Sequence, residues 1–257
     1  MNFSCKTILI TGASSGIGLS IAERLSQYDC NLILIARRIE KLDEIKVKLK
    51  NNKAEISVYK CDVSNKTEVQ NTFGCVISKY SFIDIAIMNS GVGKRIKPEN
   101  FNSNDAHEIY GVNMFGIIYW MELLLPEFIS KNKGMIVGVS SLADGRGYSG
   151  SGFYCSSKAA VSILLEGLRI ELSSYNIKIL TVRPGFVKTP MTDVNEFKMP
   201  FMISPEKAAK KIIEGIKKEK NIIEFPWPLV FLTKLIELLP NRFYEFLARK
   251  QYESIRK

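Results

Sequence analysis

Short, continuously apolar runs alternate with longer amphipathic segments along most of this 257-residue chain. Strands that are apolar at every position, rather than at alternate positions, indicate a parallel sheet that is buried on both faces. We therefore predict an α/β fold, with a doubly wound parallel sheet of about seven strands and helices on both faces. The predicted strands are residues 7–10, 32–35, 56–59, 84–88, 135–139, 178–182 and 221–224, and the predicted helices are residues 17–27, 40–50, 66–79, 105–129, 153–174 and 205–217.

Composition excludes several classes of protein. The chain has 36 basic and 26 acidic residues and a net charge of +10, but it contains no recognised nucleic-acid module, so we expect no nucleic-acid partner. Its five cysteines form no CxxC pair and His107 is its only histidine, so we expect neither a disulfide framework nor a metal site. No secretory signal precedes the first predicted strand, and no apolar run reaches the ~18 residues of a membrane-spanning helix. We therefore expect a reducing, cytoplasmic location.

A glycine-rich turn joins the first predicted strand to the first predicted helix and reads Thr-Gly-Ala-Ser-Ser-Gly-Ile-Gly over residues 11–18. Glycine is needed where the backbone turns tightly and approaches a pyrophosphate, and the free N–H groups of a helix N-terminus bind phosphate. The turn could be purely structural, but its position in the first strand-helix-strand unit favours a Rossmann-type dinucleotide site. The residues expected to contact the dinucleotide are Gly12, Ser14, Ser15, Gly16, Ile17 and Gly18.

The end of the second predicted strand indicates which dinucleotide binds. An acidic residue at this point would hold the ribose 2′-hydroxyl of NAD, but the chain has Ala36-Arg37-Arg38. Two guanidinium groups suit a 2′-phosphate, which an arginine can bind with two hydrogen bonds. The arginines could instead be solvated residues at a helix start. Because the acid is missing, we favour NADP(H) over NAD(H) as the cofactor.

Tyr154 and Lys158 are four residues apart at the start of a predicted helix, which puts both side chains on one face. A lysine ammonium beside a tyrosine favours the phenolate, as would an oxidised nicotinamide ring, so we expect the pKa of Tyr154 to fall. Such a pair also occurs by chance on protein surfaces. Here, however, other polar and glycine-containing segments follow the predicted strands. Doubly wound sheets bind their ligands at these carboxyl ends of the strands. These segments are Asn89-Ser90-Gly91, Ser140-Ser141 and residues 184–190, with Asn113 in the long helix before the fifth strand.

Together these motifs resemble the classical short-chain dehydrogenase/reductase family over residues 5–224. The matching pieces are TGxxxGIG at residues 11–18, Asp62-Val63 after the third strand, Asn89-Ser90-Gly91, Asn113, a serine 13 residues before the tyrosine, YxxxK, and PGxxxT. The spacing selects Ser141 over Ser140. The family usually has Asn-Asn-Ala-Gly where this chain has Met-Asn-Ser-Gly at residues 88–91, a departure that concerns cofactor contacts rather than the chemistry.

The resemblance implies a role for each of these residues. Tyr154 would donate a proton to a carbonyl during reduction and accept one in the reverse direction, while Lys158 would lower its pKa and hold the nicotinamide ribose. Ser141 would hydrogen-bond the substrate oxygen, and Asn113 would hold a water that links Lys158 to solvent. The cofactor contacts implied are Arg37, Arg38, Asp62 to the adenine, Val63, Asn89, Ser90, Gly91, Tyr154, Lys158, Pro184, Gly185, and Val187 and Thr189 to the carboxamide. The family commonly pairs through its long helices, so we expect a homodimer or homotetramer.

These observations predict an NADPH-dependent oxidoreductase that interconverts a carbonyl and an alcohol by hydride transfer. Residues 190–204 correspond to the family's mobile substrate lid. Met and Phe side chains there favour a ketone or aldehyde with a hydrophobic portion, although a lid that packs on its own domain would have the same composition. A serine hydrolase is excluded because residues 147–151 lack the last glycine of GxSxG. The alternative function is an NADPH-binding redox sensor or scaffold without turnover.

Residues 1–224 are predicted to form one dinucleotide-binding catalytic domain, and residues 225–257 a helical extension of different character. The extension is proline-rich at its start and then apolar, aromatic and basic, and residues 198–257 carry 13 basic and 7 acidic residues. This pattern is typical of a helix that lies in a membrane interface with its basic residues toward anionic lipid. Peripheral membrane contact through residues 226–257, a dimer contact and a cap on the substrate pocket are the three hypotheses for it.

Overall fold

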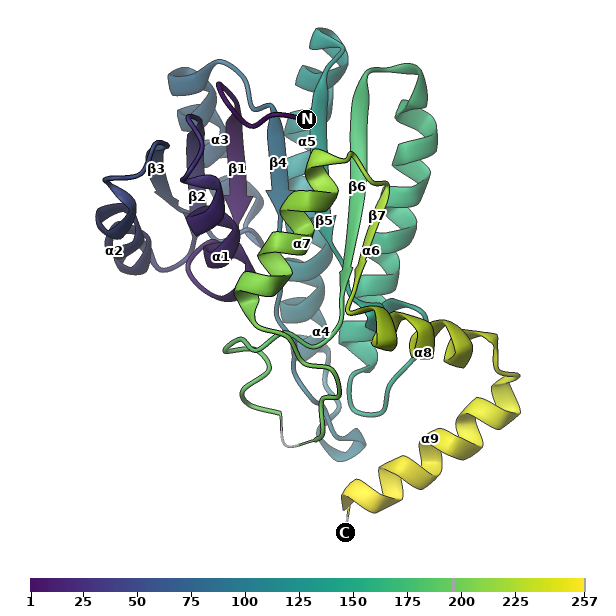
Figure 1. Cartoon of the computed structure of the whole chain (residues 1–257). Helices are drawn as coiled ribbons and strands as arrows, with labels where there is room; N and C mark the ends of the chain where they lie inside the picture. The colour runs from purple at the N-terminus through teal and green to yellow at the C-terminus, as the bar shows by residue number, and fades with distance from the viewer. Residues whose placement is uncertain (196, 257) are drawn as a thin grey trace.

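The computed structural model describes residues 1–195 and 197–256. Seven parallel strands form one sheet in the order β3-β2-β1-β4-β5-β6-β7 (Figure 1). The strand order changes direction between β1 and β4, which makes the sheet doubly wound and confirms the predicted fold class. The strands are β1 Thr7–Thr11, β2 Asn31–Ala36, β3 Glu55–Lys60, β4 Ile85–Met88, β5 Gly134–Val139, β6 Ile177–Pro184 and β7 Ile222–Phe225.

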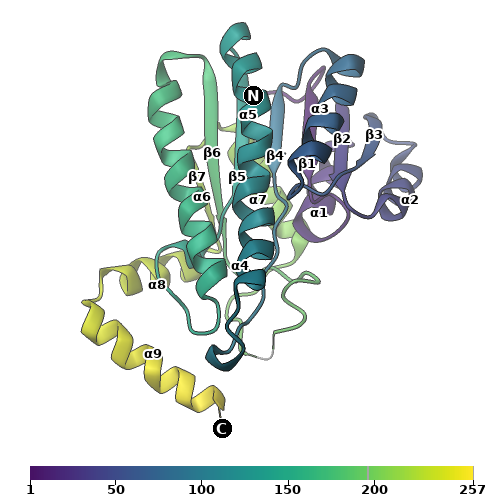
Figure 2. The ribbon, with the colours of Figure 1, turned by 180° about the vertical axis from the view of Figure 1, so that it is seen from behind.

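Helices cover both faces of the sheet (Figures 1 and 2). On one face α1, α2 and α7 form a hydrophobic core with the sheet, to which they contribute Ile21, Leu42 and Ile212. On the other face α3, α5 and α6 form a second core, which includes Val76 and Trp120. Each strand therefore needs apolar side chains on both of its sides, which explains the continuous apolar runs. The helices are α1 Gly16–Leu25, α2 Ile39–Leu49, α3 Lys66–Tyr80, α4 Ser103–Tyr110, α5 Gly116–Lys131, α6 Gly152–Glu171, α7 Pro205–Lys217, α8 Trp227–Leu238 and α9 Asn241–Arg256.

The helix predicted over residues 105–129 contains a π-helical turn. This turn covers Gly111–Phe115 and lies between α4 and α5. A π-helical turn adds one residue to a helix, and such turns are frequent at functional sites. Asn113 lies in it and is fully buried. A single added residue barely changes the apolar period, so the sequence pattern indicated a helix here but not its π-helical turn.

The run Ser103–Lys131 is long and apolar enough to cross a membrane by length and composition alone, with a mean hydropathy of 1.3 in its most apolar window. Trp120, Leu124 and Phe128 of this run are nevertheless buried in the core formed with the sheet. The apolar character of this helix is therefore explained by the core that it fills.

The C-terminal extension is partly integrated into the fold. Phe225, the first residue of the predicted extension, is instead the last residue of β7 and pairs with Pro184 in β6. α8 packs on the body through Leu229 and Thr233, whereas α9 projects away from the sheet (Figures 1 and 2). Large apolar side chains remain exposed on both helices, namely Trp227, Phe231, Leu232, Leu235, Leu238, Phe243, Phe246 and Leu247. We call these eight side chains the apolar outer face.

Candidate functional site

A cleft of about 520 Å³ opens at the carboxyl edge of the sheet. Loops from distant parts of the chain meet there because the strands are parallel and all end on the same side. Among the residues that line it are Cys61, Val92, Val112 and Val139, which the motifs did not indicate. The lining also includes residues of the predicted segments to which no contact was assigned, namely Ala36, Ser140, Pro190, Met191 and Thr192. The predicted site residues that it brings together are Gly12, Ser14, Ser15, Gly16, Ile17, Arg37, Arg38, Asp62, Val63, Asn89, Ser90, Gly91, Ser141, Tyr154, Lys158, Pro184, Gly185, Val187 and Thr189.

The glycine turn after β1 is held by the loop after β4. The side-chain amide of Asn89 donates to the carbonyls of Thr11 and Gly12 at 3.1 and 3.3 Å. Gly12 has a φ of +66°, which favours glycine. Gly18 does not line the cleft, because it packs so closely on the Gly12 carbonyl that any side chain would collide with it. Gly18 therefore brings α1 against the turn, and its predicted contact with the dinucleotide stays a prediction.

The two arginines after β2 lie at one end of the cleft. Arg38 Nη2 donates to Ser14 Oγ at 2.9 Å and to Ser15 Oγ at 3.3 Å. Arg37 Nη1 lies 3.8 Å from Asp62 Oδ2. Guanidinium groups beside serine hydroxyls and the N-terminus of α1 are the donors that phosphate groups prefer. This end of the cleft is therefore suited to the phosphates of a dinucleotide.

Lys158 is buried close to Tyr154, one helical turn along α6. Its Nζ donates to the Val139 carbonyl at 2.9 Å and lies 5.9 Å from the centre of the Tyr154 ring. Burial lowers the pKa of Lys158 to about 8, because the ammonium loses its hydration. At pH 7 the ammonium form therefore still predominates.

Burial raises the pKa of Tyr154 above its usual value near 10, and a hydrogen bond with the Ser141 side chain offsets only part of this effect. The direction is opposite to the one expected from the sequence. Lys158 directs its ammonium to a backbone carbonyl, and desolvation of the phenol has the largest effect on the pKa of Tyr154. Tyr154 therefore keeps its phenolic proton at neutral pH.

Asn113 lies behind the cleft and does not line it. Its Oδ1 accepts from the Val92 N–H at 2.8 Å, and its Nδ2 donates to the Val92 carbonyl at 2.9 Å and to Ser157 Oγ at 3.0 Å. The amide thus connects the π-helical turn, the loop after β4 and α6. A side chain at Gly91 would lie 3.4 Å from both Asn113 Oδ1 and Lys158 Nζ, so Gly91 leaves space beside both atoms. The expected water link through Asn113 stays a prediction.

The segment after β6 forms a loop at the mouth of the cleft. Its base is closed by two backbone hydrogen bonds of 3.0 Å, from Lys188 N–H to the Ile203 carbonyl and from Ile203 N–H to the Phe186 carbonyl. Phe197 packs edge-on against Phe186, and the Arg95 guanidinium lies 5.3 Å from the centre of the Phe197 ring. Pro190, Met191 and Thr192 of this loop line the cleft, and its role as a substrate lid stays a prediction.

Comparison with known proteins agrees with this geometry. Residues 6–199 match the family model described as short chain dehydrogenase. An NADP-dependent 3-hydroxy acid dehydrogenase of Schizosaccharomyces pombe is 34% identical over 232 residues, which cover 85% of this chain and 89% of that protein. A fatty acyl-CoA reductase of Acinetobacter baylyi is 30% identical over 239 residues, covering 91% and 81%. The crystal structure of a short chain dehydrogenase/reductase from Burkholderia phymatum in complex with NAD has the same fold, with a TM-score of 0.84 at 23% identity, and the match covers 91% of this chain and 94% of that one.

Burial of Lys158 predicts that this lysine titrates apart from the others. In protein labelled with ¹³C at the lysine ε-carbon, we expect one NMR signal to titrate at about pH 8, whereas exposed lysines titrate at about pH 10.4. The signal should disappear in Lys158→Met and persist in Lys188→Met, a matched change at an exposed lysine outside α6. A Lys158 signal that titrates with the exposed lysines would contradict the buried environment.

Proposed function

The chain belongs to the short-chain dehydrogenase family of oxidoreductases, and we propose that it reduces a carbonyl compound with NADPH or catalyses the reverse oxidation. The observation that carries this proposal is that Tyr154, Ser141 and the buried Lys158 line one cleft together with the glycine turn. A redox sensor or scaffold without turnover would have no need for a buried lysine beside a tyrosine and a serine. We therefore favour an enzyme over that alternative.

Tyr154 is the proposed general acid of the reduction. Because its pKa lies above the usual value, its hydroxyl keeps its proton at neutral pH and can donate it to the carbonyl oxygen. Ser141 would donate a second hydrogen bond to the same oxygen and stabilise the negative charge that develops there. Bound NADPH supplies the hydride that the carbonyl carbon accepts, so the alcohol gains one hydride and one proton. In the oxidation Tyr154 would accept the proton.

Lys158 is proposed to stabilise the charge that Tyr154 acquires. Once the phenol has lost its proton, the nearby ammonium favours the phenolate, because opposite charges attract strongly in a buried site. A pKa of about 8 leaves Lys158 protonated at neutral pH for this role. As the family resemblance implies, a water beside Asn113 and Lys158 would return a proton from solvent.

NADP(H) is the proposed cofactor. Arg38 is held against Ser14 and Ser15 at the phosphate end of the cleft, and Arg37 lines the same end. The residue at the end of β2 is Ala36, so no carboxylate is present there to bind a free ribose 2′-hydroxyl. The NADP-dependent dehydrogenase among the relatives supports this preference.

The proposed substrate is a ketone or aldehyde with a hydrophobic portion. Val92, Pro190 and Met191 line the cleft, and Gly93 lies against the Tyr154 ring and Met191. Apolar and adaptable side chains next to the proton donor suit an extended apolar substrate. The names of two relatives, a 3-hydroxy acid dehydrogenase and a fatty acyl-CoA reductase, are consistent with such a substrate class.

We propose that the protein acts as a homodimer or homotetramer. Phe115, Ile163 and Ile170 are apolar and exposed on the outer sides of the π-helical turn and α6. Exposed apolar side chains on neighbouring helices are typical of a subunit interface. The match to the short chain dehydrogenase model, whose members commonly pair through their long helices, supports the same assembly.

The apolar outer face of the extension is proposed to contact an anionic membrane from the cytoplasm. Trp227, Phe231, Leu235 and Leu238 recur at helical spacing along α8 and are all exposed. Arg249 and Lys250 are exposed on α9 and carry the charge that complements anionic lipid. The opposite side of α8 packs on the body, so the extension can present its apolar side without leaving the fold.

Replacement of Tyr154 by Phe removes the proposed proton donor but keeps the ring. We expect kcat for NADPH-dependent reduction of a hydrophobic ketone to fall by about 100- to 10,000-fold, since this is the usual contribution of a general acid. Tyr175→Phe, at an exposed tyrosine outside the cleft, should leave the rate unchanged. A Tyr154→Phe variant with full activity would refute the assignment. A wild-type protein that binds NADPH but reduces no member of a ketone and aldehyde panel would favour the sensor alternative.

Replacement of Arg38 by Ala should weaken NADPH selectively. A hydrogen bond to a charged group contributes about 1.5–3 kcal/mol, so we expect the KM for NADPH to rise about 10- to 100-fold while the KM for NADH stays constant. Steady-state kinetics with both dinucleotides measure this, and Arg242→Ala, at an exposed arginine on α9, is the matched control. Equal changes in the two KM values would show that Arg38 does not read the 2′-phosphate.

Membrane contact can be tested with vesicles of phosphatidylcholine, with and without phosphatidylglycerol. We expect the protein to cosediment with the anionic vesicles and its tryptophan emission to shift to the blue, because Trp227 is exposed and the other tryptophan, Trp120, is already buried. The double variant Trp227→Ser/Phe231→Ser should stay in the supernatant, whereas Phe101→Ser, at an exposed phenylalanine elsewhere, should still sediment. A double variant that instead dissociates into smaller oligomers would assign the apolar outer face to a second copy of the chain.

A further inference from the structure

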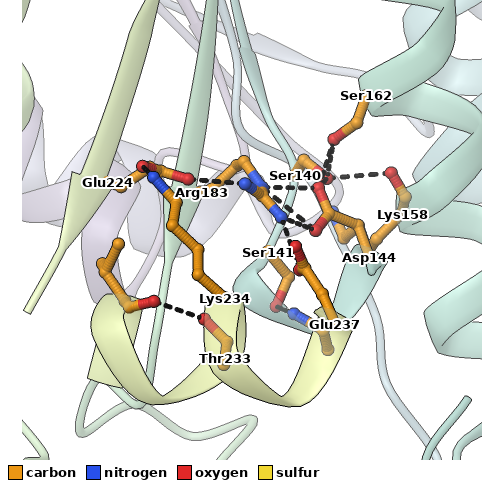
Figure 3. Close-up of polar contacts among 12 residues, drawn as sticks. Ser140, Ser141, Asp144, Lys158, Ser162, Arg183, Glu224, Thr233, Lys234 and Glu237 are labelled. Carbon is orange, nitrogen blue, oxygen red and sulfur yellow. Dashed lines mark hydrogen bonds and ion pairs between the residues drawn. The ribbon is translucent and has the colours of Figure 1, made fainter. Parts of the chain in front are cut away.

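Five charged side chains from four elements meet behind the turn that begins at Ser141 (Figure 3). Asp144 ends the short 3₁₀ turn Leu142–Asp144, which follows β5. The other members are Arg183 from β6, Glu224 from β7, and Lys234 and Glu237 from α8. We call these five residues the charge cluster, and no motif in the sequence indicated it.

Arg183 and Asp144 form the centre of the charge cluster. Arg183 Nε lies 2.8 Å from Asp144 Oδ2, and Nη2 lies 2.5 Å from Oδ1, so the guanidinium binds both carboxylate oxygens. The two side chains are 15% and 3% exposed, respectively. A buried, bidentate pair of this kind holds its two segments in one relative orientation. The position of Asp144 is therefore tied to the sheet through β6.

Asp144 is in turn connected to the site residues. Its carboxylate accepts from Ser162 Oγ at 2.5 Å and lies 3.3 Å from Ser140 Oγ, which donates its one proton to the Lys158 carbonyl at 2.8 Å (Figure 3). Its backbone N–H donates to the Ser141 carbonyl at 3.3 Å. The carboxylate thus joins the turn that carries Ser141 to α6, the helix that carries Tyr154 and Lys158.

The C-terminal helix α8 completes the charge cluster from the other side. Glu237 lies 3.3 Å from Arg183 Nη2, and its carboxylate covers Gly145 so closely that any side chain there would collide with it. Lys234 pairs with Glu224 at 2.8 Å. Arg146 also donates to the Glu237 carbonyl at 2.9 Å. The loop after Ser141 is therefore held between β6 and α8.

We propose that Asp144 and Arg183 are a positioning pair for Ser141 and Lys158, and that α8 supports this pair through Glu237. The C-terminal extension would then be part of the support of the active site as well as a surface element. The proposal rests on the function proposed above, because it gives the pair a task in carbonyl reduction. Neither residue touches the cleft, so both act through Ser141 and α6.

The carboxylate of Asp144 also contributes to the electrostatics of the site. Its negative charge favours the ammonium of Lys158 and disfavours the phenolate of Tyr154, so it raises the pKa of both groups. Arg183 compensates part of this charge. The other titratable or charged groups around Asp144 are Cys155, Glu166 and Arg169 on α6, Tyr148 in the preceding loop, Glu224 on β7 and Glu237 on α8.

Two variants test the proposal. Asp144→Asn keeps the size of the side chain but removes its charge, and Glu237→Gln weakens the support from α8 while it leaves the central pair intact. A misplaced catalytic group can cost about 100-fold, so we expect kcat to fall about 10- to 100-fold in Asp144→Asn with an unchanged KM for NADPH. For Glu237→Gln we expect a fall of about 2- to 30-fold. Glu219→Gln, at an exposed partner of Lys178, is the control and should retain full activity.

A second readout separates positioning from a general loss of stability. In Asp144→Asn the pKa of Lys158, followed by its ¹³Cε signal, should fall below the wild-type value, because a negative charge that favoured the ammonium is gone. This readout needs no turnover. If the wild-type protein reduces no carbonyl compound but the pKa of Lys158 still falls, the proposed function fails and the coupling of Asp144 to Lys158 holds. Folded variants in which neither kcat nor the pKa of Lys158 changes would overturn the proposal. If Asp144→Asn does not fold, Glu237→Gln is the deciding variant, and an unchanged kcat in it would overturn the proposal.

Discussion

The strands of the sheet are parallel, and the helices that connect them cover both of its faces. The position of every loop in the structure depends on this arrangement. A parallel strand must be followed by a crossover, so every strand ends on the same side as its neighbours. The turn after β1 and the loops after β4, β5 and β6 therefore emerge at one edge, which is the cleft. This is why Gly12, Asn89, Ser141 and Thr189 share one site although they are far apart in the chain.

Burial controls the chemistry within that cleft. Lys158 loses hydration and its pKa falls to about 8, while Tyr154 loses hydration and its pKa rises. Both changes favour the neutral form of the group, because a low-dielectric surrounding penalises any charge. The two pKa values, which differ by only ~0.4 in water, are thus moved further apart. Tyr154 thus keeps its proton and Lys158 its charge at neutral pH, and the Asp144 carboxylate favours both of these forms because it raises both pKa values.

The C-terminal extension combines two surfaces of different character. The inner side of α8 contributes Leu229 to the body and Glu237 to the charge cluster. The outer side carries exposed apolar residues such as Trp227 and Phe231. A contact made by the outer side would therefore act on a helix that is linked through Arg183 to the turn of Ser141. The apolar residues of the tail are therefore divided between an inner side that packs on the body and an exposed outer side.

The sequence by itself determined the strand-helix order, the glycine turn and most of the residues that line the cleft, because these depend on local periodicity and on short motifs such as Tyr154 with Lys158. It did not reveal the π-helical turn around Asn113, since one added residue leaves the apolar period almost unchanged. Only the tertiary structure decided the direction of the Tyr154 pKa and the pairing of Arg183 with Asp144, which are 39 residues apart. Desolvation and long-range ion pairs arise only when distant segments pack together, so no local pattern contains them.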